Sequence, residues 1–249
     1  MLRRLAFAAV AVLAGFGAAA ANDTVLVVGA TGQTGALIVQ QLRAEGYAVR
    51  ALARDPAKAA AMLAPGVEIM RGDVRDAASL AAAAKGAHKV VFAASASAGG
   101  RGDPANLPEK VDYEGVKHTV DAAKAAGADH MVLLSSAGVT HPDHPLNARF
   151  NNILRWKLKG EDYLRASGLA YTVVRPLGLR DTAGDTKGVR VLQGDTVTAG
   201  REISRADVAA VVVAALKTPA ARGKTFEIHN DDTLPVGAWR GGFAALKAD

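Results

Sequence analysis

Short apolar runs alternate with amphipathic stretches along most of the chain. Residues 25–28, 47–53, 67–70 and 89–94 are rich in Val, Ile, Leu and Ala, which is typical of buried strands, and residues 224–228 are expected to form the final strand. Residues 36–42 and 110–126 carry apolar side chains at helical spacing. This repeated alternation of strand and helix predicts an α/β fold with a mostly parallel sheet.

The first strand runs into a glycine-rich turn that leads directly into a helical pattern. Gly29, Gly32 and Gly35 stand at a three-residue spacing between residues 25–28 and 36–42. Gly29 would allow the sharp turn, Gly32 would let a pyrophosphate approach the backbone, and Gly35 would let the helix pack close to the strand. The helix N-terminus would then point at the phosphates. This context favours dinucleotide binding over a purely structural glycine turn.

The residue order in this turn resembles that of the extended and atypical short-chain dehydrogenase/reductases. The likeness is greatest to their NmrA-like, NAD(P)H-binding branch, which includes flavin and biliverdin reductases, and it runs from about residue 24 to about residue 228. It implies a single doubly wound Rossmann-type domain and a small-molecule substrate. The residues expected to hold the cofactor here are Gly29, Thr31, Gly32, Gln33, Thr34 and Gly35.

The end of the second predicted strand indicates which cofactor is bound. An NAD-preferring fold usually places an acidic residue there, whereas this chain has Arg54, with Lys58 one helical turn later. Two cations at this position favour the extra phosphate of NADP over NAD. The alternative for Arg54 is a solvated surface arginine. Asp55 precedes Pro56 and is expected to cap the next helix instead.

Further cofactor contacts are expected after the third and fourth strands. By the family resemblance, Asp73 and Val74 lie along the adenine, although a purely structural turn remains an alternative for Asp73. Asp76 is expected to cap the following helix. The fourth strand ends at the carboxyl edge of the sheet, so we expect three residues to face the nicotinamide ribose: Ala93, Ala94 and Ser95.

Two adjacent serines follow the fifth strand of the family pattern. Residues 110–126 and 131–138 are similar to the helix and strand that precede the active site in extended reductases. In the family the second serine faces the substrate, so the resemblance implies a catalytic role for Ser136 and a structural one for Ser135. The alternative is that Ser136 only caps the end of the strand.

The family resemblance also covers the active-site helix, with one departure. Residues 155–176 resemble that helix and the sixth strand, which aligns Lys157 with the lysine that holds the nicotinamide ribose. The family pattern has a tyrosine four residues earlier, and this chain has Ile153. Isoleucine cannot transfer a proton. Either Lys157 acts directly as a catalytic residue, or the acceptor takes its proton from water. The alternative is a solvated Lys157.

The remaining segments add less chemistry. Residues 177–197 are expected to be irregular and to form the outer wall of the substrate pocket, and residues 201–217 predict a helix with Ser204 or a neighbour as N-cap. Asn151 and Asn152 are plausible caps of the active-site helix. His141, Asp143 and His144 lie in a proline-rich loop without a third histidine, so we expect no metal site.

The N-terminus resembles a secretory leader. Residues 1–21 contain Arg3 and Arg4, then an uncharged apolar run that ends in alanines, which predicts a signal peptide and an exported, periplasmic protein. An uncleaved anchor, or a cytoplasmic enzyme with a mis-assigned start, are the alternatives. Residues 22–249 would form one NAD(P)-binding domain, with no stable membrane span once the leader is removed.

Composition limits the partners. The 249-residue chain carries a formal net charge of +6, or +4 without Arg3 and Arg4, which argues for neither nucleic acid nor a membrane surface. It has no cysteine, which excludes disulfides and a cysteine nucleophile. We therefore expect an NADP(H)-dependent oxidoreductase that reduces a small acceptor such as a flavin, quinone or carbonyl. A non-catalytic redox sensor of NmrA type and a cofactor-stabilised assembly factor are the alternatives, and the oligomeric state stays open.

Overall fold

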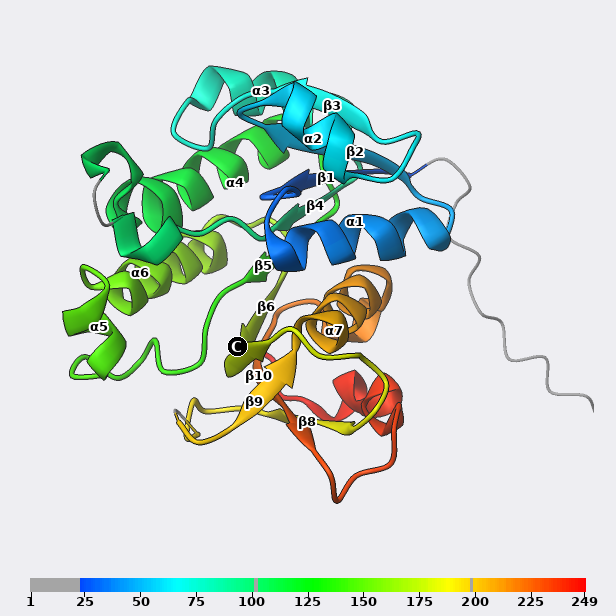
Figure 1. Ribbon diagram of the computed structural model, residues 1–249, viewed down its shortest axis with the longest axis vertical. Coiled ribbons are helices and arrows are strands. Elements are labelled where there is room, and N and C mark those ends of the chain that lie inside the picture. The colour runs from blue at the N-terminus through cyan, green and yellow to red at the C-terminus, as the bar shows by residue number, and fades with distance from the viewer. Residues whose placement is uncertain (1–22, 101–102, 198) are drawn as a thin grey trace, which may run out of the picture.

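An eight-stranded, mostly parallel sheet forms the centre of the computed structural model, which describes residues 23–100, 103–197 and 199–249 (Figure 1). The strand order is β3-β2-β1-β4-β5-β6-β10-β8, and β8 alone in this sheet runs antiparallel to its neighbour. The chain moves outward from β1 to β3, then crosses to β4 and continues in the other direction, so the doubly wound prediction is confirmed. The strands of this sheet are β1 (Thr24–Val28), β2 (Ala48–Ala53), β3 (Glu68–Arg71), β4 (Lys89–Phe92), β5 (His130–Leu134), β6 (Tyr171–Pro176), β8 (Gly188–Leu192) and β10 (Lys224–Asp231).

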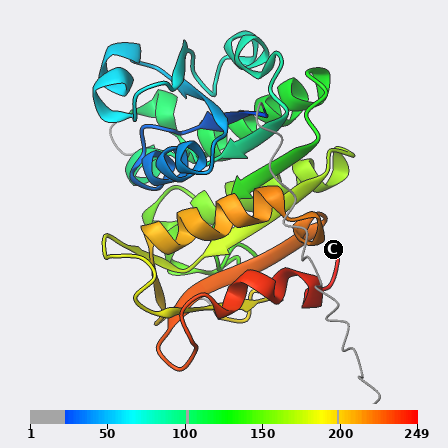
Figure 2. The same ribbon diagram turned by 90° about the vertical axis from the view of Figure 1, so that its right-hand side faces the viewer.

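Helices cover both faces of the sheet, as Figures 1 and 2 show. Alternate residues of β1 face opposite layers: Val25 and Val27 belong to the apolar core beside α1 and α7, and Leu26 and Val28 to the core beside α3, α4 and α6. All four side chains are fully buried, each contributing about 1.5–3 kcal/mol. The helices are α1 (Gln33–Ala44), α2 (Pro56–Met62), α3 (Ala77–Ala84), α4 (Gly115–Ala125), α5 (Pro145–Arg149), α6 (Ile153–Ala166) and α7 (Arg205–Lys217).

Short helical turns and a second sheet complete the structure. The second sheet pairs β7 (Gly178–Arg180) in parallel with β9 (Glu202–Ser204). The turns are η1 (Ser97–Gly100), η2 (Pro104–Asn106), η4 (Pro219–Ala221) and η5 (Ala238–Ala245), and a π-helical turn, η3 (Glu109–Glu114), leads into α4. None of the described helices is long and apolar enough to cross a membrane.

Most predicted helix caps are confirmed. The side chains of Asp55 and Asp76 accept hydrogen bonds from the backbone N–H groups of Lys58 and Ala78, and Ser204 accepts one from Asp207. For α6, Asn152 stands at the predicted N-cap position, but neither Asn151 nor Asn152 supplies a side-chain cap. Asn152 precedes the helix in a left-handed conformation and makes no capping bond with its side chain.

The cap of α6 comes instead from a preceding helix. The side-chain oxygen of Asn147, in α5, accepts a hydrogen bond from the Leu154 N–H at 3.0 Å. Asn147 is buried, and its amide nitrogen donates to the Pro142 carbonyl. The turn between the two helices brings α5 beside the first turn of α6. A residue seven positions before Leu154 therefore supplies the cap.

Residues 177–197 are more regular than predicted. They contain β7 and β8, and β9 follows at residues 202–204. β7 and β9 have three residues each, and their pairing joins segments more than twenty residues apart. Periodicity within a short window does not detect such strands, because they are too short to show an alternating pattern.

The sheet has a topological switch point between β1 and β4. β1 pairs in parallel with β2 on one side and with β4 on the other. The chain leaves the carboxyl ends of β1 and β4 toward opposite faces, which opens a crevice between them. The candidate site lies at this edge.

Candidate active site

Two adjacent cavities lie at the carboxyl edge of the sheet. The smaller, of about 320 Å³, and the larger, of about 660 Å³, share the segment Ala93, Ala94 and Ser95 directly after β4. The smaller cavity is also lined by Gly29, Thr31, Gly32, Leu52, Ala53, Arg54, Lys58, Gly72, Asp73, Val74, Asn106 and Val111. The end of β4 therefore borders both cavities.

The glycine turn is shaped by close backbone contacts. Gly29 has a φ of +87°, and a Cβ atom there would lie 2.5 Å from the Ala94 nitrogen. A Cβ atom on Gly35 would lie 2.0 Å from the Gly29 carbonyl oxygen, whereas one on Gly32 would lie 3.3 Å from it. Gly29 and Gly35 thus have structural reasons to be glycine. Gly32 is exposed toward the smaller cavity, where a side chain would stand in the way of a ligand.

The N-terminus of α1 adjoins this turn and is open to an anion. Gly32 is its N-cap and offers no side chain to the first-turn N–H groups. Unsatisfied N–H groups and the helix dipole together favour a bound phosphate. Thr34, in this first turn, lines the larger cavity.

Two of the predicted cofactor residues line neither cavity. Gln33 is exposed, and its side-chain nitrogen donates to the Asp181 carboxylate at 3.3 Å, which connects α1 to the segment after β7. Gly35 is buried beneath the turn. The structure therefore gives Gly35 a packing position and Gln33 a position at the rim.

Two cations stand at the end of β2. Arg54 and Lys58 both line the smaller cavity and are exposed. Within the described residues, neither side chain makes a hydrogen bond or an ion pair. Both are therefore available to a ligand phosphate.

Asp73 and Val74 form part of the opposite wall. The carboxylate of Asp73 accepts two hydrogen bonds from the Arg75 guanidinium, at 2.9 and 2.6 Å, and one from the Arg75 backbone N–H. These bonds lower the pKa of Asp73 below its usual value. Asp73 therefore meets the cavity as a carboxylate already neutralised by a cation, and Arg54 is the next positive group that acts on it.

A buried ion pair lies beside the shared segment. The Lys157 ammonium, on α6, lies 2.7 Å from the Asp112 carboxylate, whose side chain is fully buried in η3. The same carboxylate accepts hydrogen bonds from the Ser95 hydroxyl at 2.7 Å and the Ala96 N–H at 3.0 Å. Our sequence reasoning missed Asp112. The available signal was an acidic residue among apolar ones on the buried side of a helix.

The two serines after β5 both line the larger cavity but differ in their bonding. The Ser136 hydroxyl donates to the Ala137 carbonyl at 3.0 Å. The Ser135 hydroxyl is buried and has no hydrogen-bond partner among the described residues. The substrate-facing role of Ser136 stays a prediction, and Ser135 is the serine with unused hydrogen-bonding capacity.

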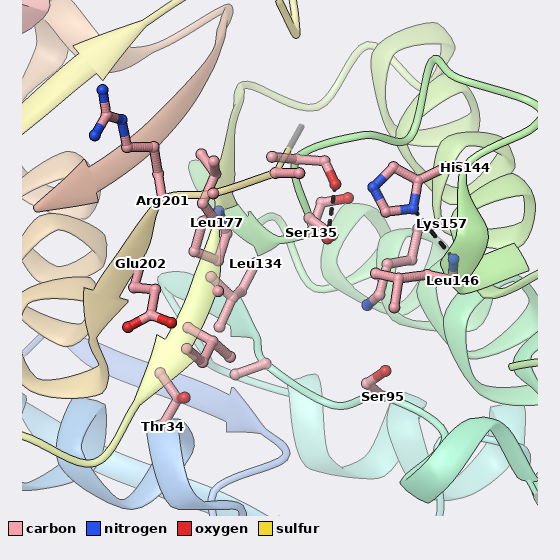
Figure 3. Close-up of a pocket in the computed structure, with 18 of the residues that line it drawn as sticks. Thr34, Ser95, Leu134, Ser135, His144, Leu146, Lys157, Leu177, Arg201 and Glu202 are labelled. Atoms are coloured by element: carbon pink, nitrogen blue, oxygen red, sulfur yellow. Dashed lines mark hydrogen bonds between the residues drawn. The ribbon is translucent and has the colours of Figure 1, made fainter. Parts of the chain in front are cut away.

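The rest of the larger cavity is mainly aliphatic. Figure 3 shows Lys157 and His144 on one side and Glu202 on the opposite side, while the Arg201 side chain extends away from the cavity. Glu202 is paired with Arg180 at the surface. The apolar residues that line this cavity are Ala93, Ala94, Leu134, Ala137, Leu146, Pro176, Leu177, Leu179 and Ala199.

The histidine loop supports the walls of this cavity. The imidazole of His144 accepts a hydrogen bond from the Leu146 N–H, and His141 contacts the Asp195 carbonyl at 2.8 Å. The buried Asp195 carboxylate also accepts from the N–H groups of Gly138 and Thr140. No group of three metal-ligating side chains comes together in the part of the chain that the structure describes.

Comparison with known proteins relates this site to nicotinamide chemistry. A sequence profile described as NAD(P)H-binding matches residues 29–219. An uncharacterized chloroplastic protein of Arabidopsis thaliana is 40% identical over 224 residues, which span 82% of this chain and 69% of that protein. Sanguinarine reductase of Eschscholzia californica is 35% identical over 241 residues, spanning 82% of this chain and 88% of that enzyme.

A solved structure shares the same architecture. A putative NAD-dependent epimerase/dehydratase from Bacillus halodurans superposes with a TM-score of 0.75 and 28% identity, covering 88% of this chain and 99% of the other.

The comparisons also correct the predicted location. Relatives whose names state a compartment are chloroplastic plant proteins, so periplasmic export is not supported and that prediction is wrong. The leader on which the prediction relied, residues 1–21, lies outside the described residues.

Proposed function

The chain belongs to the NAD(P)H-binding family, and from this premise we propose that it is an NADPH-dependent reductase of a small, largely apolar organic acceptor, such as a flavin, quinone or carbonyl compound. The observation that carries the proposal is the pair of cavities that share the segment after β4, with a glycine turn at one and Lys157 at the other. Sanguinarine reductase, which aligns with most of this chain, supports the assignment to oxidoreductases.

The residues present fit NADPH. The smaller cavity would hold the adenosine end between Arg54, Lys58 and the Asp73–Val74 segment, and the N-terminus of α1 would hold the pyrophosphate. The two free cations favour the 2′-phosphate that distinguishes NADP from NAD. The segment from Ala93 to Ser95 would lead the nicotinamide into the larger cavity. When bound, the cofactor supplies the hydride.

Lys157 is the residue we assign to the acceptor's developing charge. Its ammonium lines the larger cavity with only 12% of its side chain exposed, so it acts in surroundings that screen charge less than water does. Hydride addition leaves an electron pair on the acceptor's oxygen or nitrogen, which a nearby cation stabilises. Ser136 is the second residue we propose to face the acceptor.

We propose a proton source other than the tyrosine of the family pattern. Ile153 stands where the family pattern has tyrosine, and among the described residues no tyrosine lines the larger cavity. We propose that water entering through the mouth of the cavity protonates the reduced acceptor. Flavins and quinones suit this route, because their reduced forms exchange protons with water readily.

The lining of the larger cavity also favours an apolar acceptor over a nucleotide sugar. A nucleotide-sugar substrate, as an epimerase would use, carries two phosphates that need several cationic or N–H partners. The described lining offers one inward cation, Lys157, and a wall of leucine, proline and alanine side chains. A ring system with one or two polar atoms matches this surface better.

The test is NADPH oxidation by the full chain with a panel of flavins, quinones and small carbonyls. We expect Lys157→Met to lower kcat by about 100-fold, the order seen when a preorganised charge-stabilising group is removed. Lys159→Met is the matched control, because Lys159 lies on the same helix but over the rings of Tyr113 and Trp156. It should change kcat by less than about twofold.

The opposite outcome would identify a sensor. Tight NADPH binding without oxidation in the presence of any acceptor would overturn the reductase proposal for this panel. Different affinities for NADP and NADPH would then point to the non-catalytic redox sensor.

A further inference from the structure

The buried carboxylate of Asp112 bonds to residues that line the two cavities. It pairs with the Lys157 ammonium at 2.7 Å and accepts hydrogen bonds from the Ser95 hydroxyl at 2.7 Å and the Ala96 N–H at 3.0 Å. Lys157 lines the larger cavity, while Ser95 lines both. One side chain thus holds the lysine of the proposed reaction and the segment along which the cofactor would pass.

The local sequence explains how this carboxylate reaches both partners. Asp112 lies in the π-helical turn η3, and Gly160 lies on α6 one turn after Lys157. A Cβ atom on Gly160 would lie 2.7 Å from the Asp112 carbonyl oxygen and 3.3 Å from Val116. Only glycine therefore allows α6 to pack this closely against η3, and that closeness brings Lys157 within bonding distance of Asp112.

The other side of the same turn faces the smaller cavity. Val111 lines that cavity, and a Cβ atom on Gly115 would lie 3.0 Å from Val74. η3 is therefore held between the adenine side of the site and α6. A shift of this turn would move the walls of both cavities together.

Burial restricts the conformations that the Asp112 and Lys157 side chains can adopt. A fully buried carboxylate is unfavourable unless charged and polar groups surround it, and here three donors do so. A lysine side chain on its own has many rotamers. The ion pair selects those in which the ammonium stays beside the Ser95 segment.

We propose that Asp112 is a positioning residue of the reductase: it holds Lys157 against the segment Ser95–Ala96, so that the lysine and the cofactor-binding edge are placed as one unit. The inference rests on the proposed function for its catalytic consequence. The pairing itself can be tested without turnover.

The first experiment measures the reactivity of Lys157. The full chain is treated with acetic anhydride, and peptide mass spectrometry gives the ratio of labelling at Lys157 to that at Lys159. In the wild-type protein we expect a ratio well below one. Asp112→Asn keeps the shape but removes the carboxylate that holds the Lys157 side chain in its buried position, so we expect the ratio to rise about tenfold.

The second experiment measures kinetics in the same variant. Asp112→Asn should lower kcat about tenfold while KM for NADPH changes less than about threefold, because the adenosine and phosphate contacts remain. Asp121→Asn is the matched control. Asp121 lies on α4 and accepts a hydrogen bond from Tyr163 of α6 at 2.6 Å, so it also holds α6 in place but lines neither cavity.

The outcomes separate the two proposals. An unchanged labelling ratio in Asp112→Asn, or the same rise in Asp121→Asn, would overturn the positioning role, whatever the turnover. A raised ratio without turnover on any acceptor would support the pairing and count against the reductase. If Asp112→Asn does not fold, the labelling ratio of the wild-type protein tests the positioning role. A Lys157 that labels as fast as Lys159 is not held by a carboxylate, and that result would overturn the proposal.

Discussion

Gly35 packs against Gly29 so closely that a Cβ atom on Gly35 would lie 2.0 Å from the Gly29 carbonyl oxygen. This contact sets the angle at which α1 leaves the glycine turn, and so the direction of its N-terminal N–H groups. Gly32, between them, has more space, with 3.3 Å to the same oxygen. The three glycines therefore serve different purposes although the sequence shows them as one motif.

Substitution separates these purposes. Gly35→Ala forces the backbone apart, and we expect it to destabilise the protein by about 3 kcal/mol. Gly32→Ala leaves the thermal midpoint nearly unchanged, but its methyl group meets the pyrophosphate and weakens NADPH binding about tenfold. Thermal unfolding and a fluorescence titration with NADPH measure the two effects. Equal loss of stability in both variants would contradict the assignment.

The cations at the end of β2 should decide between NADPH and NADH. The double variant Arg54→Ala/Lys58→Ala is expected to raise the Kd for NADPH by at least about 100-fold, since each charge-assisted bond to the 2′-phosphate contributes about 1.5–3 kcal/mol. NADH, which lacks this phosphate, should bind with nearly the same Kd. Titration with both nucleotides at constant salt gives the comparison.

Arg50 provides the control for this experiment. It lies on the same strand, but its guanidinium bonds to Glu68 and to the carbonyls of Ala83 and Lys85. Arg50→Ala should leave the ratio of the two Kd values unchanged. If Arg50→Ala weakened the preference for NADPH over NADH as much as the double variant does, the net charge, and not the two cations of the cavity, would set that preference.

His130 should make the fold sensitive to acid. It is fully buried on β5, between the Leu216 carbonyl and the Thr172 hydroxyl, and burial lowers its pKa from 6.5 to about 4. In the unfolded chain His130 therefore takes up a proton near pH 6.5, whereas in the folded protein it does so only near pH 4. Stability is complete above pH 6.5 and falls as the pH decreases to 4, by about 3 kcal/mol in total.

Urea unfolding at pH 7, 6 and 5 tests this slope. His130→Gln should be less stable at pH 7, because its neighbours lose well-placed partners, yet its stability should change less between pH 7 and pH 5. If the variant keeps the full acid dependence of the wild type, the titrating group lies elsewhere.

Arg175 holds a buried group of carboxylates together. Its guanidinium contacts Glu161 at 2.6 Å and Glu227 at 3.2 Å, and lies 4.0 Å from Asp195. Burial raises the pKa of Glu227, which shows how weakly solvated this region is. Arg175→Met removes the guanidinium from Glu227 and Asp195, while Glu161 keeps its pair with Arg165 at 2.7 Å, and we expect a loss of about 3–5 kcal/mol.

Loss of the Arg175 guanidinium should also disturb the wall of the larger cavity, because the Asp195 carboxylate binds the loop after β5. Thermal unfolding measures the effect, and Lys110→Ala, which removes an exposed pair with Glu114, serves as the control and should leave the midpoint unchanged. An Arg175→Met protein as stable as the control would mean that the buried carboxylates are satisfied by other groups.

The sequence by itself determined the features that depend on residues close together in the chain. The apolar runs predicted β1, β2, β3 and β4, the spacing of Gly29 and Gly35 predicted a strand–turn–helix unit, and Asp55, Asp76 and Ser204 were identified as caps. Each of these depends on a backbone pattern or on a side chain within one helical turn of its partner. The family resemblance added the alignment of Lys157 and the cofactor class.

Only the tertiary structure decided which distant side chains meet. Asp112 and Lys157 are 45 residues apart, the cap of α6 comes from Asn147 in another helix, and β7 finds its partner in β9. Neither hydrophobic period nor propensity describes such pairs, because a buried polar group takes whichever partner the packing of the core brings within reach. The close approach of α6 to η3 at Gly160, and not the identity of Asp112 alone, is what places a carboxylate beside the lysine.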